Sequence, residues 1–195
     1  SKGLMDERIF QQRVDEYLKV ATSVDQSTSP TGIAANLIRA AREPGYSWNV
    51  DAVTVATLEQ VFTKIDEWQD TRDFDLMYLH WLLALGQGDT PATTLSPEVI
   101  EAITARMLAN RYRYDDPLPA DRLDNLWFWS ENHRIIGLAI EYLSGQRFPD
   151  QTFAITGLTG DKHLERARPG ILDWIKERAQ LGFFEWHSNV YMLKN

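Results

Sequence analysis

The sequence contains no cysteine among its 195 residues. This absence excludes disulfide bonds, thiolate metal ligands and cysteine nucleophiles, although it does not identify a cellular compartment. Basic residues are also scarce, with 20 Lys and Arg against 28 Asp and Glu, which makes the formal net charge −8. Because nucleic acids and anionic membrane surfaces attract basic patches, we expect no nucleic-acid partner.

Long apolar runs are missing as well. No stretch reaches the roughly 18 residues that a membrane-spanning helix needs, so we expect no membrane span. Residues 1–20 carry charged side chains throughout and predict no signal peptide within this chain. The four histidines form no pair four residues apart, and no carboxylate spacing is typical of a metal cage. We therefore predict no metal and no cofactor, and leave localisation and oligomeric state open.

The pattern that remains is helical. Apolar residues recur at spacings of three and four, and caps, prolines and glycines divide the chain into seven expected helices. These helices are predicted at residues 5–21, 30–42, 51–68, 74–85, 96–112, 131–143 and 159–179. No segment predicts a strand, and residues 151–155 are interpreted as loop. With 44% hydrophobic residues, the sequence predicts a single all-helical domain over residues 1–195.

Two of the expected helices, 74–85 and 131–143, are apolar on most sides and are each followed by a Gly-Gln pair. The pairs, Gly86-Gln87 and Gly145-Gln146, lie 59 residues apart. Such helices need burial on more than one face, whereas the helices between and after them are amphipathic. This alternation predicts stacked antiparallel helical hairpins.

A box of aromatic and polar residues lies at 127–134, and residues 184–191 repeat its character. The first box combines Trp127, Phe128 and Trp129 with Ser130, Glu131, Asn132, His133 and Arg134; the second contains Glu185, Trp186, His187, Asn189 and Tyr191. Aromatic side chains are costly to expose and these polar ones are costly to bury unpaired. Each box therefore belongs either to a satisfied polar network or to the wall of a ligand cleft.

Residues 127–191 resemble a largely uncharacterised bacterial group. The resemblance rests on Trp129 to His133, Tyr142 to Asp150, Gly157 to Gly160 and Gly182 to Tyr191. That group is similar to the (α/α) toroids, the six-hairpin glycosidase-like superfamily that also includes polysaccharide lyases. The resemblance implies a carbohydrate-active protein and an incomplete toroid. Because a complete ring needs more hairpins than this chain supplies, we expect a fragment of a larger toroid protein.

Under this resemblance, a polysaccharide or oligosaccharide is the expected partner. In a hydrolase, Glu131 or Asp124 would be the general acid and Glu185 the base or nucleophile, since glycoside hydrolysis needs two carboxyls about 5–9.5 Å apart. In a lyase, Asn132 would neutralise a uronate, His133 or Tyr142 would transfer protons, and Arg134 would bind the acidic sugar. The predicted catalytic residues are Glu131, His133 and Glu185, and the predicted substrate-binding residues are Trp127, Trp129, Asn132, Arg134, Trp186, His187, Asn189 and Tyr191.

A non-catalytic hypothesis stands beside these two. The box residues can also pack helices together, in which case the chain is a helical-repeat interaction or structural module. His80 lies among apolar neighbours in the sequence and predicts a satisfied core histidine, whereas His163 is expected to be an exposed residue in the first turn of its helix.

Overall fold

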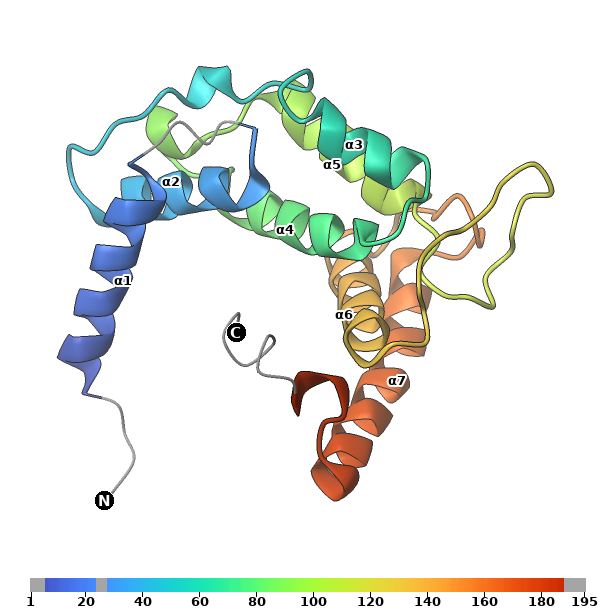
Figure 1. Cartoon of the computed structure of the whole chain (residues 1–195). Coiled ribbons are helices and arrows are strands. Elements are labelled where there is room, and N and C mark those ends of the chain that lie inside the picture. Colours follow the sequence, from blue (N-terminus) through green and yellow to red (C-terminus); the bar gives the residue numbers. More distant parts are fainter. Residues whose placement is uncertain (1–5, 24–27, 188–195) are drawn as a thin grey trace. The chain divides into compact units, whose positions relative to one another are not determined.

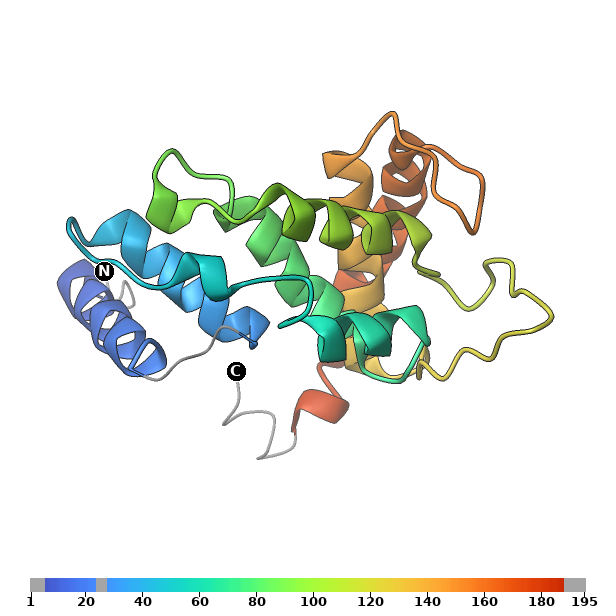
Figure 2. The same ribbon diagram turned by 90° about the horizontal axis from the view of Figure 1, so that it is seen from above.

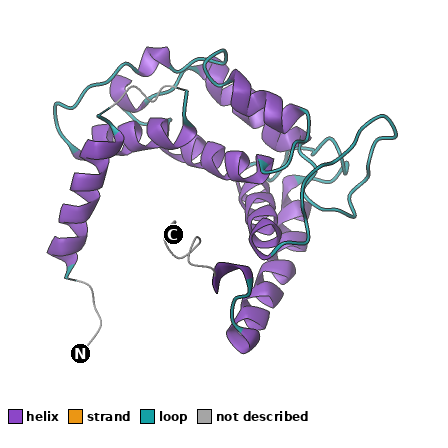
Figure 3. Cartoon of the chain, viewed as in Figure 1, coloured by secondary structure: helices purple, strands orange, loops and turns teal. Residues whose placement is uncertain are grey.

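The structure is a computed structural model that describes residues 6–23 and 28–187 (Figure 1). All regular elements in these residues are helical, which confirms the predicted all-α class (Figure 3). The chain forms two compact units. The first unit comprises Ser1–Glu59 with Trp81–Ala102, and the second comprises Gln60–His80 with Ile103–Asn195. A single domain and a toroid arrangement of its hairpins stay predictions.

The first unit begins with two helices that contact each other, α1 (Glu7–Ala21) and α2 (Pro30–Arg42). The bounds of α2 are those that the sequence predicted, because Ser29 caps the helix and proline suits its first turn. Leu18 of α1 is buried, and Arg42 forms an ion pair with Asp15 at 3.0 Å. Small and apolar side chains cover most of α2, which places it inside this unit.

Helix α3 (Glu59–Asp66) is shorter than the predicted helix 51–68. The prediction was wrong at its start because Thr54 and Thr57 bond to each other. The Thr57 hydroxyl accepts from the Thr54 N–H at 2.8 Å, and the Thr54 hydroxyl accepts from the Thr57 N–H at 3.1 Å. Such local bonds compete with the helical ladder and hold the segment in a turn. At the other end, Trp68 adopts a left-handed φ of 53°.

Helices α4 (Arg72–Leu85) and α5 (Pro97–Ala109) are divided between the units: α4 up to His80 and α5 from Ile103 belong to the second unit, together with the helices that follow. Both begin or end within a few residues of their predicted bounds. The buried apolar side chains of this unit include Phe62, Ile65, Leu76, Leu79, Ile103, Met107, Ile140 and Phe153. Figure 2 shows the long loop between α5 and α6. Several polar contacts described below involve residues of this loop.

Helices α6 (Glu131–Arg147) and α7 (Gly160–Leu181) lie side by side (Figures 1 and 2). Helix α6 extends past the predicted end at residue 143, so Gly145 lies inside it. A Cβ atom at Gly145 would lie 2.7 Å from the Leu164 nitrogen, so the two helices approach too closely there for a side chain. Gly182, with a φ of 77°, ends α7 as predicted.

Candidate functional site

The first box forms the entry to α6. Ser130 is the N-cap, and its hydroxyl accepts from the His133 N–H at 3.3 Å. The Asn132 side-chain oxygen accepts from the same N–H at 2.8 Å and from the Ser130 hydroxyl at 2.6 Å. Asn132 is therefore buried in the cap. The sequence box is first of all the local signal that begins the helix.

The two boxes meet through their glutamates. The Glu131 carboxylate accepts from the backbone N–H groups of Phe184, Glu185 and Trp186 at 3.1, 2.8 and 3.4 Å. These groups begin the short 3-10 helix Glu185–His187. In return, Glu185 Oε2 accepts from the Asn132 N–H at 3.0 Å, at the start of α6. Each glutamate therefore caps the N-terminus of the helix that carries the other.

Arg178 completes the contact by pairing with the Glu131 carboxylate, whose side chain is 7% exposed. Burial alone would raise the pKa of Glu131, but the Arg178 pair and the backbone N–H donors outweigh burial and lower the pKa below its usual 4.5. The structure brings the segments of Glu131 and Glu185 together through these reciprocal contacts. The oxygens of Glu131 are occupied by structural donors, which disfavours this residue as a general acid.

Trp186 belongs to a cluster of aromatic rings. It stacks on Phe183 with ring centroids 5.1 Å apart and an interplanar angle of 16°, and it contacts Trp174 at 5.7 Å. The Trp174 indole N–H donates to the Glu131 carbonyl at 3.2 Å. These contacts anchor the segment after α7 on α6. Of the other predicted residues in this box, His187 lies in the 3-10 helix, and Asn189 and Tyr191 lie outside the described residues.

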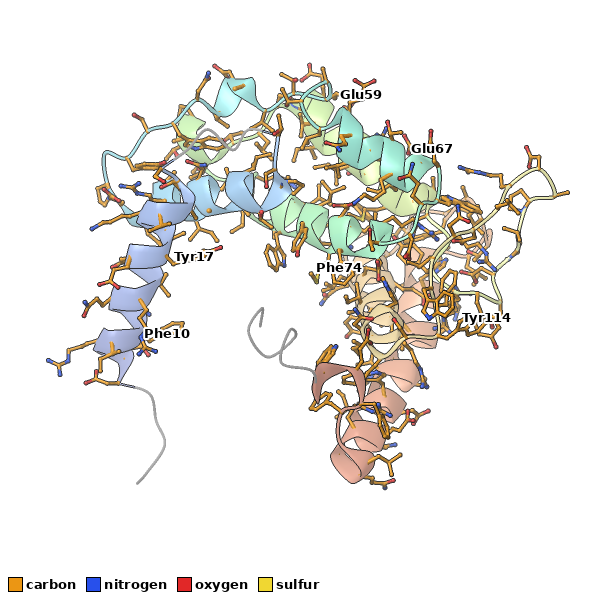
Figure 4. The ribbon with its side chains drawn as sticks, viewed as in Figure 1. Phe10, Tyr17, Glu59, Glu67, Phe74 and Tyr114 are labelled. Carbon is orange, nitrogen blue, oxygen red and sulfur yellow. The ribbon has the colours of Figure 1, made fainter. Side chains whose placement is uncertain are left out.

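His133 is held by Asp73, which lies in the first turn of α4. The two side chains are buried, and His133 Nδ1 lies 2.6 Å from Asp73 Oδ2. Phe74, labelled in Figure 4, packs edge-on against the imidazole with centroids 5.4 Å apart. The hydrogen bond to Asp73 raises the pKa of His133, burial opposes this, and the charges of Asp73, Asp70 and Glu185 add to the rise.

Two open clefts adjoin this end of α6. The His133 cleft, of about 230 Å³, is lined by residues that include Tyr112, Arg113, Tyr114, Phe128, His133 and Arg134. The Trp129 cleft, of about 390 Å³, is lined by residues that include Trp129, Glu131, Arg134, Trp174, Glu177 and Phe184. Arg134 lines both clefts, which lie in the second unit.

Trp129 contacts Tyr114, which lies on the loop after α5 (Figure 4). Their ring centroids are 4.7 Å apart, yet Trp129 is 65% exposed and Tyr114 59%. Trp127 is 62% exposed and does not line either cleft. Arg134 is half-exposed and pairs with Glu177 at 3.2 Å, a surface contact worth about 0–1 kcal/mol. Trp129 and Arg134 are thus the predicted binding residues that the structure places in open clefts.

His133 and Tyr142, the two residues predicted to transfer protons in a lyase, lie far apart on α6. Nine positions divide Tyr142 from His133. At about 1.5 Å and 100° per residue, that spacing places Tyr142 roughly 13.5 Å further along the axis and on the opposite side. Tyr142 therefore cannot share a proton-transfer site with His133 on this helix. Asn132 points its amide oxygen into the cap, as described above.

Asp124, the other predicted acid, lies in a buried ion cluster. Arg72 binds both of its oxygens at 2.7 and 2.9 Å, and Arg111 binds one at 3.0 Å. Arg72 also donates to the Asn110 side chain at 3.1 Å. Arg72 is fully buried and the Asp124 side chain is 3% exposed. Asp124 is therefore placed as the counter-charge of two arginines, without access to a cleft substrate.

A second buried cluster surrounds Glu141. His163 Nδ1 lies 2.9 Å from its carboxylate, and Arg113 and Arg166 also pair with it. The expectation that His163 is exposed was wrong. The residue is 1% exposed, bonds to Thr156 through its other nitrogen at 2.7 Å and stacks on a phenylalanine ring. The position of His163 in the first turn of its helix suggests exposure, but Glu141, the partner that holds it in the interior, lies 22 residues away in the sequence.

His80 is a core histidine, as predicted. Its Nε2 lies 2.9 Å from the Ser144 hydroxyl, which also contacts the Tyr112 hydroxyl at 2.8 Å. Burial lowers the pKa of His80 to about 4. The imidazole is therefore neutral at physiological pH. It ties α4 to α6 within the second unit and lies outside the two clefts.

In the described residues, no cluster of three or more His, Cys, Asp or Glu side chains has metal-binding geometry, and no helix is long and apolar enough to cross a membrane. The chain was compared with family models, curated proteins and solved structures, and none of them matches it.

Proposed function

We propose that the second unit binds an oligosaccharide in the two clefts at the N-terminal end of α6. The observation that carries this proposal is the exposed aromatic pair of Trp129 and Tyr114, in contact at 4.7 Å and beside Arg134, which both clefts share. Large exposed aromatic rings are costly in water and mark binding surfaces when they gather beside a cleft.

The chemistry of the lining suits a sugar. Trp and Tyr offer apolar faces with a polar edge, and sugar rings offer apolar C–H faces with hydroxyl groups around them. Arg134 supplies up to five N–H donors, and the neighbouring Glu177 supplies acceptors. Because their mutual ion pair is half-exposed and weak, both side chains can exchange it for sugar hydroxyls at little cost.

We propose oligosaccharide binding and not hydrolysis, because neither carboxylate that was predicted as the general acid is free to protonate a substrate. Glu131 is occupied by Arg178 and three backbone donors, and Asp124 is enclosed by two arginines. A general acid must reach the glycosidic oxygen within hydrogen-bond distance. Neither carboxylate is free to do so in this arrangement, whereas the aromatic pair is open.

Isothermal titration of the chain against neutral and uronic-acid oligosaccharides tests the proposal. Trp129→Ala removes half of the aromatic pair, and we expect it to weaken binding at least about tenfold, or about 1.4 kcal/mol, as for a central aromatic contact. Trp127→Ala is the matched control, since it removes the same side chain at nearly the same exposure outside both clefts. We expect it to change the Kd less than about twofold.

Either of two results would refute the proposal. One is the absence of binding to every neutral and acidic oligosaccharide in the panel. The other is an equal loss of affinity in Trp127→Ala and Trp129→Ala, which would show that the cleft has no special role.

A second candidate is the helical interaction module, and α1 favours it. Phe10 and Tyr17, labelled in Figure 4, are 40% and 66% exposed, and Ile9 and Val20 on the same helix are 48% and 73% exposed. Exposed apolar side chains at helical spacing are typical of a surface that pairs with another helix. Tyr17→Glu would weaken such pairing, measured as self-association in analytical ultracentrifugation, and would leave oligosaccharide binding unchanged.

A further inference from the structure

We infer that Asp73 and His133 form an acid–base pair whose free imidazole nitrogen, Nε2, exchanges a proton with a hydroxyl group of the ligand in the His133 cleft. Asp73 is the positioning residue and His133 the proton donor or acceptor. The identity of the ligand rests on the proposed function, whereas the pair itself is defined by contacts that hold in the free protein.

Asp73 and Phe74 fix the orientation of the His133 ring. The 2.6 Å contact between His133 Nδ1 and Asp73 Oδ2 directs one ring nitrogen into the protein, and the edge-on Phe74 ring fixes the plane. The imidazole lines the cleft, and its Nε2 has no hydrogen-bond partner among the described residues. In this geometry the neutral ring carries its proton on Nδ1 and presents the Nε2 lone pair to the ligand.

His133 differs from His163 and His80, the other two histidines whose side chains the structure describes. His163 makes the same kind of contact, with Nδ1 2.9 Å from Glu141, but its Nε2 is bonded to Thr156. His80 is bonded to Ser144 through Nε2. Both rings are therefore fixed in structural networks. His133 differs because a carboxylate holds one nitrogen while the other lies in a cleft.

Asp73 is buried with one of its carboxylate oxygens unpaired in the described residues. Its side chain is 1% exposed, and its Oδ1 atom has no hydrogen-bond partner within the described part of the chain. Leaving an oxygen of a buried carboxylate unpaired costs stability. The charged groups around the ring are the carboxylates of Asp70, Asp73, Asp115 and Glu185 and the guanidinium groups of Arg113 and Arg134. The nearest of these, Asp73, favours the imidazolium.

The proton transfer balances within the pair and the ligand. In the imidazolium form, the Nε2–H bond breaks, an O–H bond forms on a ligand oxygen that has gained negative charge, and the ring returns to its neutral Nδ1–H form. In the reverse direction, the Nε2 lone pair takes a hydroxyl proton and the oxygen keeps the bonding electrons. Asp73 stabilises the positive ring in both directions.

The test is a pH titration of the ¹⁵N-labelled imidazoles by NMR in the intact chain, combined with carbethoxylation of histidines mapped by mass spectrometry. We expect His133 to titrate above 6.5, its neutral form to carry the proton on Nδ1, and its Nε2 to react faster than that of His163. Asp73→Asn removes the charge at constant shape, and we expect the His133 pKa to fall.

Gly137→Ala provides a second variant that leaves the pair in place. Gly137 lines the cleft, and a Cβ atom there would meet only the Tyr112 carbonyl, at an ordinary 3.5 Å. Alanine also favours a helix more than glycine does, so the variant should fold. We expect the added methyl group to slow carbethoxylation of His133 while its pKa stays the same.

A neutral His133 that carries its proton on Nε2, a pKa that Asp73→Asn does not lower, or a His133 as inert as His163 would each overturn the inference. Protection by oligosaccharide separates the two claims. If the pair titrates as expected but no oligosaccharide slows the modification of His133, the pair stands and the proposed ligand fails.

Discussion

The buried cluster around Asp124 predicts a large loss of stability from a single isosteric change. Asp124→Asn keeps the shape of the side chain and removes its charge. Arg72 and Arg111, both buried, would then lose the carboxylate that binds them through three contacts of 2.7–3.0 Å. One amide oxygen would remain as an acceptor, and the amide N–H₂ group would face guanidinium donors.

The magnitude follows from these contacts. A hydrogen bond to a charged group contributes about 1.5–3 kcal/mol and a neutral one about 0.5–1.5, so three weakened contacts amount to about 3 kcal/mol. Leaving one partner of a buried ion pair uncompensated typically costs about 3–5 kcal/mol, which agrees. For a protein of this length, each kcal/mol lowers Tm by about 2–4 °C, so we expect a fall of about 6–20 °C.

Differential scanning calorimetry and urea denaturation measure the effect, and amide hydrogen exchange at Asn110 and Leu126 localises it to the second unit. Asp121→Asn is the matched control, because Asp121 lies exposed in the same loop and should change stability by no more than about 0.5 kcal/mol. A loss below about 1 kcal/mol in Asp124→Asn would refute the reasoning, since it would show that the two arginines find other acceptors or water.

Two further predictions concern His80 and Glu131. The pKa of His80 is about 4 in the folded protein against an ordinary 6.5, so the unfolded chain binds more protons between these values and stability falls as pH drops from 6.5 towards 4. His80→Gln should remove about 3 kcal/mol of that pH dependence in urea titrations, and an unchanged pH profile would contradict the assignment. Glu131→Gln should weaken the cap of the 3-10 helix Glu185–His187 by about 1–2 kcal/mol. Amide exchange of Phe184, Glu185 and Trp186 should quicken accordingly, while the α5 amides, as an internal control, stay protected.

Local sequence signals predicted much of the fold. Pro30 marked the start of α2 and Gly182 marked the end of α7. These signals act through bonds between near neighbours in the chain, so the sequence contains them directly. Where such a bond was overlooked, as between Thr54 and Thr57, the predicted helix began too early.

The partners of the buried charges could not be predicted in the same way. Asp73 and His133 are 60 residues apart, and Arg72 and Asp124 are 52 apart. Spacing along the chain says nothing about which distant side chain meets a given charge. One signal was nevertheless present: Arg72, Asp73 and Asp75 stand at the start of an otherwise apolar helix. Charges there must find partners when the helix is buried.

The glutamates of the two boxes and His133 of the first box differ in what they suggest about function. Two helix N-termini that face each other both carry partial positive charge and unsatisfied N–H groups, and the reciprocal glutamates satisfy both ends. The repeated Glu therefore needs no catalytic explanation. We infer a function for His133 on other grounds: Asp73 holds its Nδ1, Asp73 Oδ1 lacks a partner in the described residues, and the ring lines a cleft. The reciprocal caps account for the glutamates, whereas a histidine held on one side and placed at a cleft suits the proposed function.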